Sequence, residues 1–438
     1  MSDWTPQDNN NLNKYLHTVR RIEEHREEKA VKEIKRKYRD IIKTTRNIIA
    51  QYYAQYADPE TGALSYTQLH AASLDARLLE EIAARMNITT AEEAIIIRKL
   101  VEDTYEASWK GMVDAVSRAS NDEELQNQLF SVEAVKPETV KAAVDNPVHG
   151  LTLSDQLEQH RNEIIYDIKK AVGVGLSVGD RYDAMAKRIQ TTLVGPNGMG
   201  GSYSKAIRIA RTEAHRVREE GNLDAAQNVT EKLEGAGFTM VKIWVTMKDE
   251  RVRPNSVRKT KHGFRYSTRG KYNHVKMDGV SVPINEDFHL PSGATGPAPG
   301  QTGVAGEDIN CRCFLKYEVK QDFANWARKN NGTLEANGMA MDEKKITKYM
   351  LDENGKHSAD FFEAGYNKDD GTLLFNDIAS QFNLNNATEL KNDKYGRRFN
   401  IYMTLGKTHK LSFRTNWIQK DGEDVPRFVS AYRRRPPQ

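Results

Sequence analysis

The stretch EEHREEKAVKEIKRKYRD, residues 23–40, decides how the first part of the chain folds. Acidic and basic side chains are mixed along it, which is typical of a helix whose outer face lies in water. Apolar side chains recur at helical spacing in this stretch and beyond it, at Ile34, Tyr38, Ile41, Ile42 and Ile48. Because residues three and four apart share one side of a helix, the pattern predicts a long amphipathic helix over residues 14–56.

More helix is expected after a turn at residues 58–64. One amphipathic helix is marked by Leu74, Leu78, Ile82 and Met86. Thr90-Ala-Glu-Glu93 matches a capping box, so a new helix is predicted to begin at Thr90. Pro137 suits the first turn of another helix. The chain up to residue 149 is therefore predicted to be a helical bundle or an extended interaction arm.

Composition narrows the class of protein. The chain has 438 residues, of which 38% are hydrophobic and 29% charged, so several domains with much exposed surface are expected. No run approaches the ~18 apolar residues that cross a membrane, and a signal peptide is not expected. Cys311 and Cys313 are the only cysteines, which excludes a disulfide-scaffold domain.

The helical pattern is interrupted near residue 172, where the sequence GVGLSVGD occurs. β-Branched and aromatic residues predict strands at Val241–Met247 and Ile309–Val319, joined by a long irregular region. Gly, Asn and small residues then indicate a linker, and alternating residues predict more strands near the C-terminus. The predicted fold class is multidomain α+β, with a helical arm at 1–149, a central α+β domain at 150–320, a linker at 321–344 and a small α+β domain at 345–438.

Two regions of the chain are strongly basic. Residues 391–438 carry a net charge of +8, and residues 251–277 hold nine Lys/Arg and no acidic residue. Such patches indicate a polyanion or an acidic protein surface as partner. Candidates for contact with DNA phosphates are Arg251, Arg253, Arg258, Lys259 and Lys261. The alternative is a solvated loop or a contact to another protein.

The two cysteines form a candidate metal site. In an extended strand, residues two apart point to the same face, so both thiolates could share one tetrahedral zinc ion. His274, His262 or His289 would complete the ligand set. The spacing is not that of a zinc knuckle, and the alternative is a pair of buried, inert thiols on a core strand.

An ordered set of short motifs runs through the central part of the chain. It consists of Ala210-Arg211-Thr212-Glu213, Trp244-Val-Thr-Met-Lys-Asp249-Glu-Arg251-Val252-Arg253, His274, Asp278-Gly279, Phe288 and Glu307-Asp-Ile-Asn310-Cys311-Arg312-Cys313. The set resembles the phage Mu F-like head morphogenesis family, the minor head proteins of tailed bacteriophages, over about residues 150–318. In the family a histidine usually follows the D-x-R-V-R element closely, whereas here His274 is displaced by an insertion.

The resemblance implies a non-enzymatic protein that is made beside the portal, incorporated in few copies, and needed for head assembly or DNA delivery. The implied partners are the portal protein, the major capsid and scaffold proteins, and DNA; the implied location is the head interior or the portal, after assembly in the host cytoplasm. The motif residues Arg211, Glu213, Trp244, Asp249 and Asn310 are then expected to be structural. Arg211 and Glu213 are predicted to pair with Asp249, Arg251 or Arg253, with a catalytic role as the alternative.

Residues 345–438 resemble small domains at the ends of bacterial polymorphic toxins, suspected relatives of barnase- or colicin-like RNases. The matching segments are Lys345–Leu351, His357–Phe362, Gly365-Tyr366, Thr415–Trp417 and Pro426–Tyr432. The resemblance implies an RNase toxin delivered with the virion, with RNA as substrate or an immunity protein as partner. His357 would transfer protons, Arg414 would bind phosphate, and Thr415 or Tyr432 would orient it. The alternative is a non-catalytic binding module in which His357 merely begins a helix.

Overall fold

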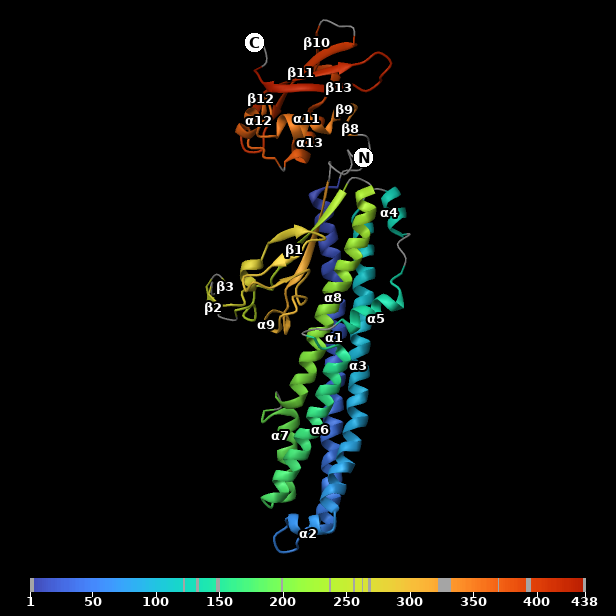
Figure 1. The fold of residues 1–438 in the computed structure, drawn as a ribbon, viewed down its shortest axis with the longest axis vertical. Coiled ribbons are helices and arrows are strands. Elements are labelled where there is room, and N and C mark those ends of the chain that lie inside the picture. Colours follow the sequence, from blue (N-terminus) through green and yellow to red (C-terminus); the bar gives the residue numbers. More distant parts are fainter. Residues whose placement is uncertain are drawn as a thin grey trace.

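A computed structural model describes most of the chain. It covers residues 4–435 except 121–122, 131–133, 147–149, 198–199, 236–237, 255–256, 262, 267–268, 322–331, 369 and 391–394. Figure 1 shows a long helical bundle, a sheet-containing region beside it, and a separate C-terminal unit beyond one end. The predicted multidomain α+β class is therefore confirmed. Among the described residues, every helix is too short or too polar to cross a membrane.

The bundle is built on two helices of exceptional length. α1 (Pro6–Tyr56) begins at Thr5, whose side chain and that of Asp8 form a capping box. α3 (Leu74–Ala119) packs along α1. The other helices of this part are α2 (Tyr66–Ala71), α4 (Glu123–Phe130), α5 (Pro137–Asp145), α6 (Leu153–Ser177), α7 (Tyr182–Val194) and α8 (Gly201–Gly235). Pro137 occupies the first turn of α5, as predicted.

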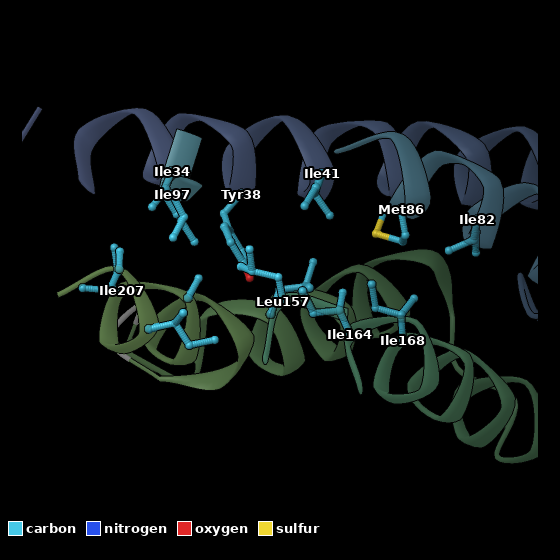
Figure 2. Close-up of a cluster of buried hydrophobic side chains, with 14 of the residues drawn as sticks. Ile34, Tyr38, Ile41, Ile82, Met86, Ile97, Leu157, Ile164, Ile168 and Ile207 are labelled. Carbon is cyan, nitrogen blue, oxygen red and sulfur yellow. The ribbon is translucent and has the colours of Figure 1, made fainter. Parts of the chain in front are cut away.

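One apolar core runs through the bundle. In Figure 2, side chains of α1 and α3 face side chains of α6 and α8. The labelled residues are Ile34, Tyr38, Ile41, Ile82, Met86, Ile97, Leu157, Ile164, Ile168 and Ile207. The boundary expected at residues 149/150 does not separate two cores, because α6, α7 and α8 complete the bundle that α1 and α3 begin.

The helix start predicted at Thr90 is wrong, since α3 continues without a break. The Thr90 hydroxyl donates to the Met86 carbonyl oxygen, 2.8 Å away, in the manner of a mid-helix threonine. Glu93 does not cap anything; it is 2% exposed and faces His160 of α6.

The central sheet is small and antiparallel. Its strand order is β4-β1-β7, and β1 contacts α8. These strands are β1 (Phe238–Val245), β4 (Ser281–Pro283) and β7 (Phe314–Gln321). The long connection from β1 to β7 contains β2 (Val257–Thr260), β3 (Gly263–Tyr266), the 3-10 helix η1 (His274–Met277), β5 (Phe288–His289), β6 (Thr295–Gly296) and α9 (Ala305–Asp308). The strand predicted from Ile309 therefore begins only at Phe314, after α9 and a turn.

The free edge of β7 is covered by α1. The Asn9 side chain accepts from the Val319 N–H at 2.8 Å and donates to the Val319 carbonyl oxygen at 3.0 Å. Asn13 does the same for Tyr317, at 3.1 Å and 2.7 Å. Two side-chain amides thus replace a neighbouring strand and protect an edge that would otherwise pair with another chain. The helical arm and the central sheet are locked together by these bonds.

The C-terminal unit has its own core and a six-stranded sheet of order β10-β11-β12-β13-β9-β8. Its strands are β8 (Thr333–Ala336), β9 (Met339–Asp342), β10 (Thr388–Glu389), β11 (Arg397–Leu405), β12 (Leu411–Gln419) and β13 (Arg427–Arg433). Its helices are α11 (Glu343–Lys345), the π-helix η2 (Ile346–Met350), α12 (Ser358–Glu363), α13 (Gly371–Gln381) and the 3-10 helix η3 (Leu384–Asn386).

The linker predicted at 321–344 is wrong for residues 333–344, which form the β8–β9 hairpin and the start of α11. Asn337 and Gly338 make its turn, with φ of 48° and 72°. Asn-Gly takes this left-handed conformation at low cost, and between alternating residues it is the strongest short hairpin signal. Residues 322–331 lie outside the described chain.

Candidate metal centre and neighbouring sites

Three of the predicted metal ligands come together. The Nδ1 atom of His274 lies 3.3 Å from the Cys313 sulfur and 3.6 Å from the Cys311 sulfur. The ligand atoms of all three residues lie within 4.8 Å of one another, and the residues are buried. His289, a predicted alternative, is exposed on β5, and His262 lies outside the described residues.

Local backbone features bring the two segments of the site together. His274 opens η1, where the Asn273 side chain accepts from the Lys276 N–H. Asn310, just before the cysteines, has a left-handed φ of 57°, and its N–H donates to the Thr212 hydroxyl of α8 at 3.3 Å. The predicted structural role of Asn310 is thus a turn that fixes the cysteine segment against α8.

A carboxylate holds the other side of the imidazole. Glu307 accepts from His274 Nε2 at 2.7 Å and from the Ser292 hydroxyl. Burial alone would raise the pKa of Glu307, but these hydrogen bonds outweigh it and lower that pKa below its usual value. For His274, burial opposes the charge, yet the contacts with Cys311 and Glu307 raise its pKa to about 9.

Two further side chains contact the sulfurs. His215 of α8 lies against Cys311, and Trp244 of β1 lies against Cys313. The pKa of the Cys311 thiol is lowered by its hydrogen bond with Cys313 and, against the effect of burial, by His215 and His274. Trp244 is fully buried and meets the His274 ring edge-on, with 5.5 Å between centroids. Gly300 has φ of 85°, and a Cβ there would lie 3.2 Å from the His215 ring, so glycine allows this close approach.

A cavity of about 730 Å³ adjoins the site. Cys311 and His215 line it together with side chains of α1, α8 and the loop after β1. Charged lining residues are Arg20, Glu24, Glu27, Glu28, Arg211, Arg218, Glu250, Arg251, Arg253 and Arg312. Because both signs are present, the cavity is polar rather than a purely cationic groove.

The motif residues pair differently from the prediction. Arg211 pairs with Glu27 of α1 at 3.1 Å, and buried Glu213 pairs with Arg216 at 3.0 Å. Asp249 pairs with Arg312. The predicted helix-to-loop pairing is therefore wrong: α8 is tied to α1, and the loop after β1 is tied to the cysteine segment.

The candidate DNA contacts are dispersed. Arg251 and Arg253 line the cavity, where the Arg253 guanidinium donates to the Ile309 carbonyl oxygen. Lys261 is exposed at the turn between β2 and β3. The side chains of Arg258 and Lys259 lie outside what the structure describes, although both residues belong to β2.

The C-terminal candidates are partly brought together. The His357 ring lies 5.7 Å from the Tyr432 ring, and Tyr432 is the cross-strand partner of Arg414. Thr415 is not part of this group: it is fully buried on the opposite face, donating to the Ile401 carbonyl oxygen at 2.8 Å. His357, Tyr432 and Arg414 thus share one surface, and Thr415 belongs to the core.

Comparison with known proteins identifies two domains in the chain. The family "Phage Mu protein F like protein" matches residues 166–316, and a "Domain of unknown function (DUF6883)" matches residues 334–435. "Minor head protein GP7" of Bacillus phage SPP1 is 28% identical over 318 residues, 72% of this chain and 88% of that protein. "NAD(+)--arginine ADP-ribosyltransferase EFV" of Enterococcus faecalis is 28% identical over 213 residues, 49% of this chain and only 38% of that protein. No solved structure is significantly similar to this chain.

A helical arm joined to a domain of this kind defines a class, that of phage head-morphogenesis proteins. Residues 166–316 of the chain match the phage Mu F-like family and form its head-morphogenesis domain. Within that class it is a minor head protein of phage head morphogenesis, and hence a virion component.

Proposed function

We propose that this minor head protein acts next to the portal, on the inside of the head, during capsid assembly and the packaging or ejection of DNA. The observation that supports this most is the continuity of arm and family domain. α8 contributes to both cores, and α1 covers the edge of β7 through Asn9 and Asn13. A stiff rod with a compact domain fixed to its flank can hold two virion partners at a set separation.

The arm also exposes apolar side chains that could meet those partners. Ile88 and Ile95 of α3 are 56% and 66% exposed, although most large apolar residues of α3 are buried. They lie seven residues apart, which places them on one side of the helix. Exposed apolar side chains grouped in this way support a contact with the portal protein or with the capsid or scaffold proteins.

Incorporation into heads tests this proposal. A chain with Ile88→Ser and Ile95→Ser should fold normally but enter heads at a reduced level. Glu106→Ser, an exposed change on the same helix, is the control and should enter at the normal level. Fully infective heads assembled without the protein would refute the proposed role in assembly.

Contact with DNA is a second part of the proposal. Arg251 and Lys261 are exposed in the basic region. Replacing both with alanine should weaken DNA binding by the full chain and reduce its salt dependence, because phosphate contacts release counterions. Lys35→Ala with Lys43→Ala, exposed lysines on α1, is the matched control. Equal binding by both double variants would remove the DNA contact from the proposal.

The surface shared by His357, Tyr432 and Arg414 favours a second function, cleavage or binding of RNA by the C-terminal unit. The His357 imidazole could transfer a proton, and the Arg414 guanidinium could hold a phosphate. Arg414 and Tyr432 belong to residues 391–438, which carry a net charge of +8. The full chain would be incubated with bacterial RNA and with plasmid DNA. RNA fragments that vanish in His357→Ala but persist in His409→Ala, an exposed histidine of the same unit, would support an RNase. Intact RNA would indicate that the C-terminal unit is a non-catalytic binding module.

A further inference from the structure

We propose that Cys311, Cys313 and His274 bind one zinc ion through both sulfurs and the imidazole Nδ1 atom, with Glu307 orienting the imidazole. The site lies in the central domain and is independent of the proposed portal and RNA roles. It would join η1 to the segment that enters β7, two pieces of chain that lie outside the strands of the central sheet.

The spacing of the three ligand atoms fits zinc. With Zn–S of about 2.3 Å and Zn–N of about 2.0 Å, tetrahedral angles put sulfur and nitrogen about 3.5 Å apart. The two observed separations, 3.3 Å and 3.6 Å, lie on either side of that value. Two thiolates with one imidazole favour zinc over magnesium or calcium, which require oxygen ligands.

The hydrogen bonds around His274 favour a metal more than a proton between the three groups. Glu307 already accepts from Nε2, and Ser292 uses its only hydroxyl proton on the same carboxylate. In the neutral tautomer this leaves the Nδ1 lone pair directed at two sulfurs. A carboxylate behind a ligating histidine is the usual outer contact of zinc sites. One proton on Nδ1 could satisfy one sulfur but not both, whereas one zinc ion satisfies all three groups.

Two further buried ring nitrogens lie beside the sulfurs. Trp244 Nε1 and His215 Nε2 are buried and lack an aligned hydrogen-bond partner within the described part of the chain. Trp244 contacts Cys313 and His215 contacts Cys311. Donors of this kind are suited to metal-bound thiolates, which remain good acceptors.

His215 is assigned as a positioning residue and not as a fourth ligand. Arg218 donates to its Nδ1 atom at 2.7 Å, and a guanidinium can only donate. The proton of neutral His215 is therefore on Nε2, the atom left for Cys311. The fourth coordination position is thus left to a small ligand such as water, and zinc binding would release the thiol protons.

Metal content of the full chain, purified from zinc-containing medium, tests the proposal. We expect one zinc per chain, and none in Cys311→Ser or Cys313→Ser. His289→Ala, an exposed histidine of the same domain, should keep the metal. A folded wild-type chain without zinc, and unable to take up added zinc, would overturn the site.

A ligand variant that misfolds would also lose zinc, so cobalt(II) bound to the wild-type chain gives a second test. We expect the absorption of tetrahedral cobalt with thiolate-to-cobalt charge transfer; octahedral cobalt without that band would overturn the ligand set. Glu307→Gln should keep the stoichiometry but weaken zinc affinity about 10–100-fold in chelator competition. His215→Ala should keep zinc and shift the charge-transfer band; loss of zinc there would make it a ligand, against our assignment.

Discussion

His160 and His274 are both buried, at 2% and 1% exposure of their side chains, yet their surroundings give them opposite chemistry. His160 lies in the bundle, where Tyr38 is 3.0 Å and Glu93 3.5 Å from its Nε2 atom. Burial lowers its pKa to about 4, assisted by Lys205. The pKa of His274 is instead raised to about 9 by its partners. Burial alone therefore does not distinguish a core histidine from a candidate ligand.

The carboxylates beside the two histidines differ in the same way. Burial raises the pKa of Glu93 to about 8, so Glu93 is mostly protonated at neutral pH and the bundle cluster is uncharged. Glu307 has a lowered pKa because it accepts two hydrogen bonds. The bundle buries a neutral polar cluster that joins helices, whereas the central domain assembles anionic groups that a cation can neutralise.

The largest expected effect comes from removing metal. Chelator treatment of the full chain should expose the segment from β5 to Cys313 to protease while the helical circular dichroism of the bundle persists. Losing the ion would remove three coordination bonds that join η1 to the cysteine segment, so we expect a larger effect than from the loss of any single contact here. His160→Ala should not alter this response. Unchanged protease resistance after complete zinc removal would show that zinc does not stabilise this segment, and His274 would then be a core histidine like His160.

The next effect concerns the bundle cluster. Glu93→Ala removes a buried side chain and leaves Tyr38 and His160 with a cavity, at a cost of about 3 kcal/mol. Glu93→Gln keeps the shape of the side chain and replaces an already protonated group, so we expect a loss of stability of only about 1 kcal/mol. Thermal unfolding, followed by the helical signal at pH 7, measures both. Equal losses would mean that Glu93 is ionised in the folded bundle.

The pH dependence of the bundle sharpens the comparison further. The pKa of Glu93 rises from 4.5 to about 8 on folding, so its stabilisation is complete below pH 4.5 and is lost as the pH rises through 8. For His160 the pKa falls from 6.5 to about 4, so that contribution is lost as the pH falls through this range. Glu23, with a pKa raised to about 7, adds to the same loss up to about pH 7.

We therefore expect the unfolding temperature of the helical signal to fall between pH 6.5 and 8, the range above the pKa of unfolded histidine and below that of folded Glu93. The fall should be smaller in Glu93→Gln, with the remainder due to groups such as Glu23. Identical slopes in wild type and variant would show that Glu93 is already ionised in the folded state over this range.

Local sequence patterns predicted those features of the fold that depend on residues close together in the sequence. The period-two alternation of β11 and β12 was sufficient for those strands. Cys311 and Cys313 do lie together beside His274, but they precede β7, so the strand geometry expected to align them is not what brings them together. The pair Asn337-Gly338 is itself a local hairpin signal. The linker prediction missed it because that prediction used only the composition of the segment.

Partners far along the chain could not be predicted in this way. Thr90-Ala-Glu-Glu93 fits a capping box, but the true partner of Glu93 is His160 on another helix. Glu307 belongs to the quoted motif, yet its role depends on η1. His215 stands one helical turn after Arg211, and that shared helix face was the available signal. Side-chain roles in both clusters follow from tertiary contacts that no local pattern encodes.

The smallest expected effect tests whether a residue of the family motif also contributes to the stability of the fold. Arg211 belongs to the head-morphogenesis motif, but its side chain is 50% exposed and pairs with Glu27 at the surface. Such pairs contribute about 0.5 kcal/mol, because water screens them and ordering long side chains costs entropy. Arg211→Ala should therefore barely shift the unfolding temperature, unlike Glu93→Ala, although Glu93 lies outside the motif. If the Arg211→Ala variant unfolds normally but fails to enter heads, Arg211 acts at the cavity surface in assembly. A large loss of stability would instead show that the Arg211–Glu27 pair between α1 and α8 stabilises the bundle.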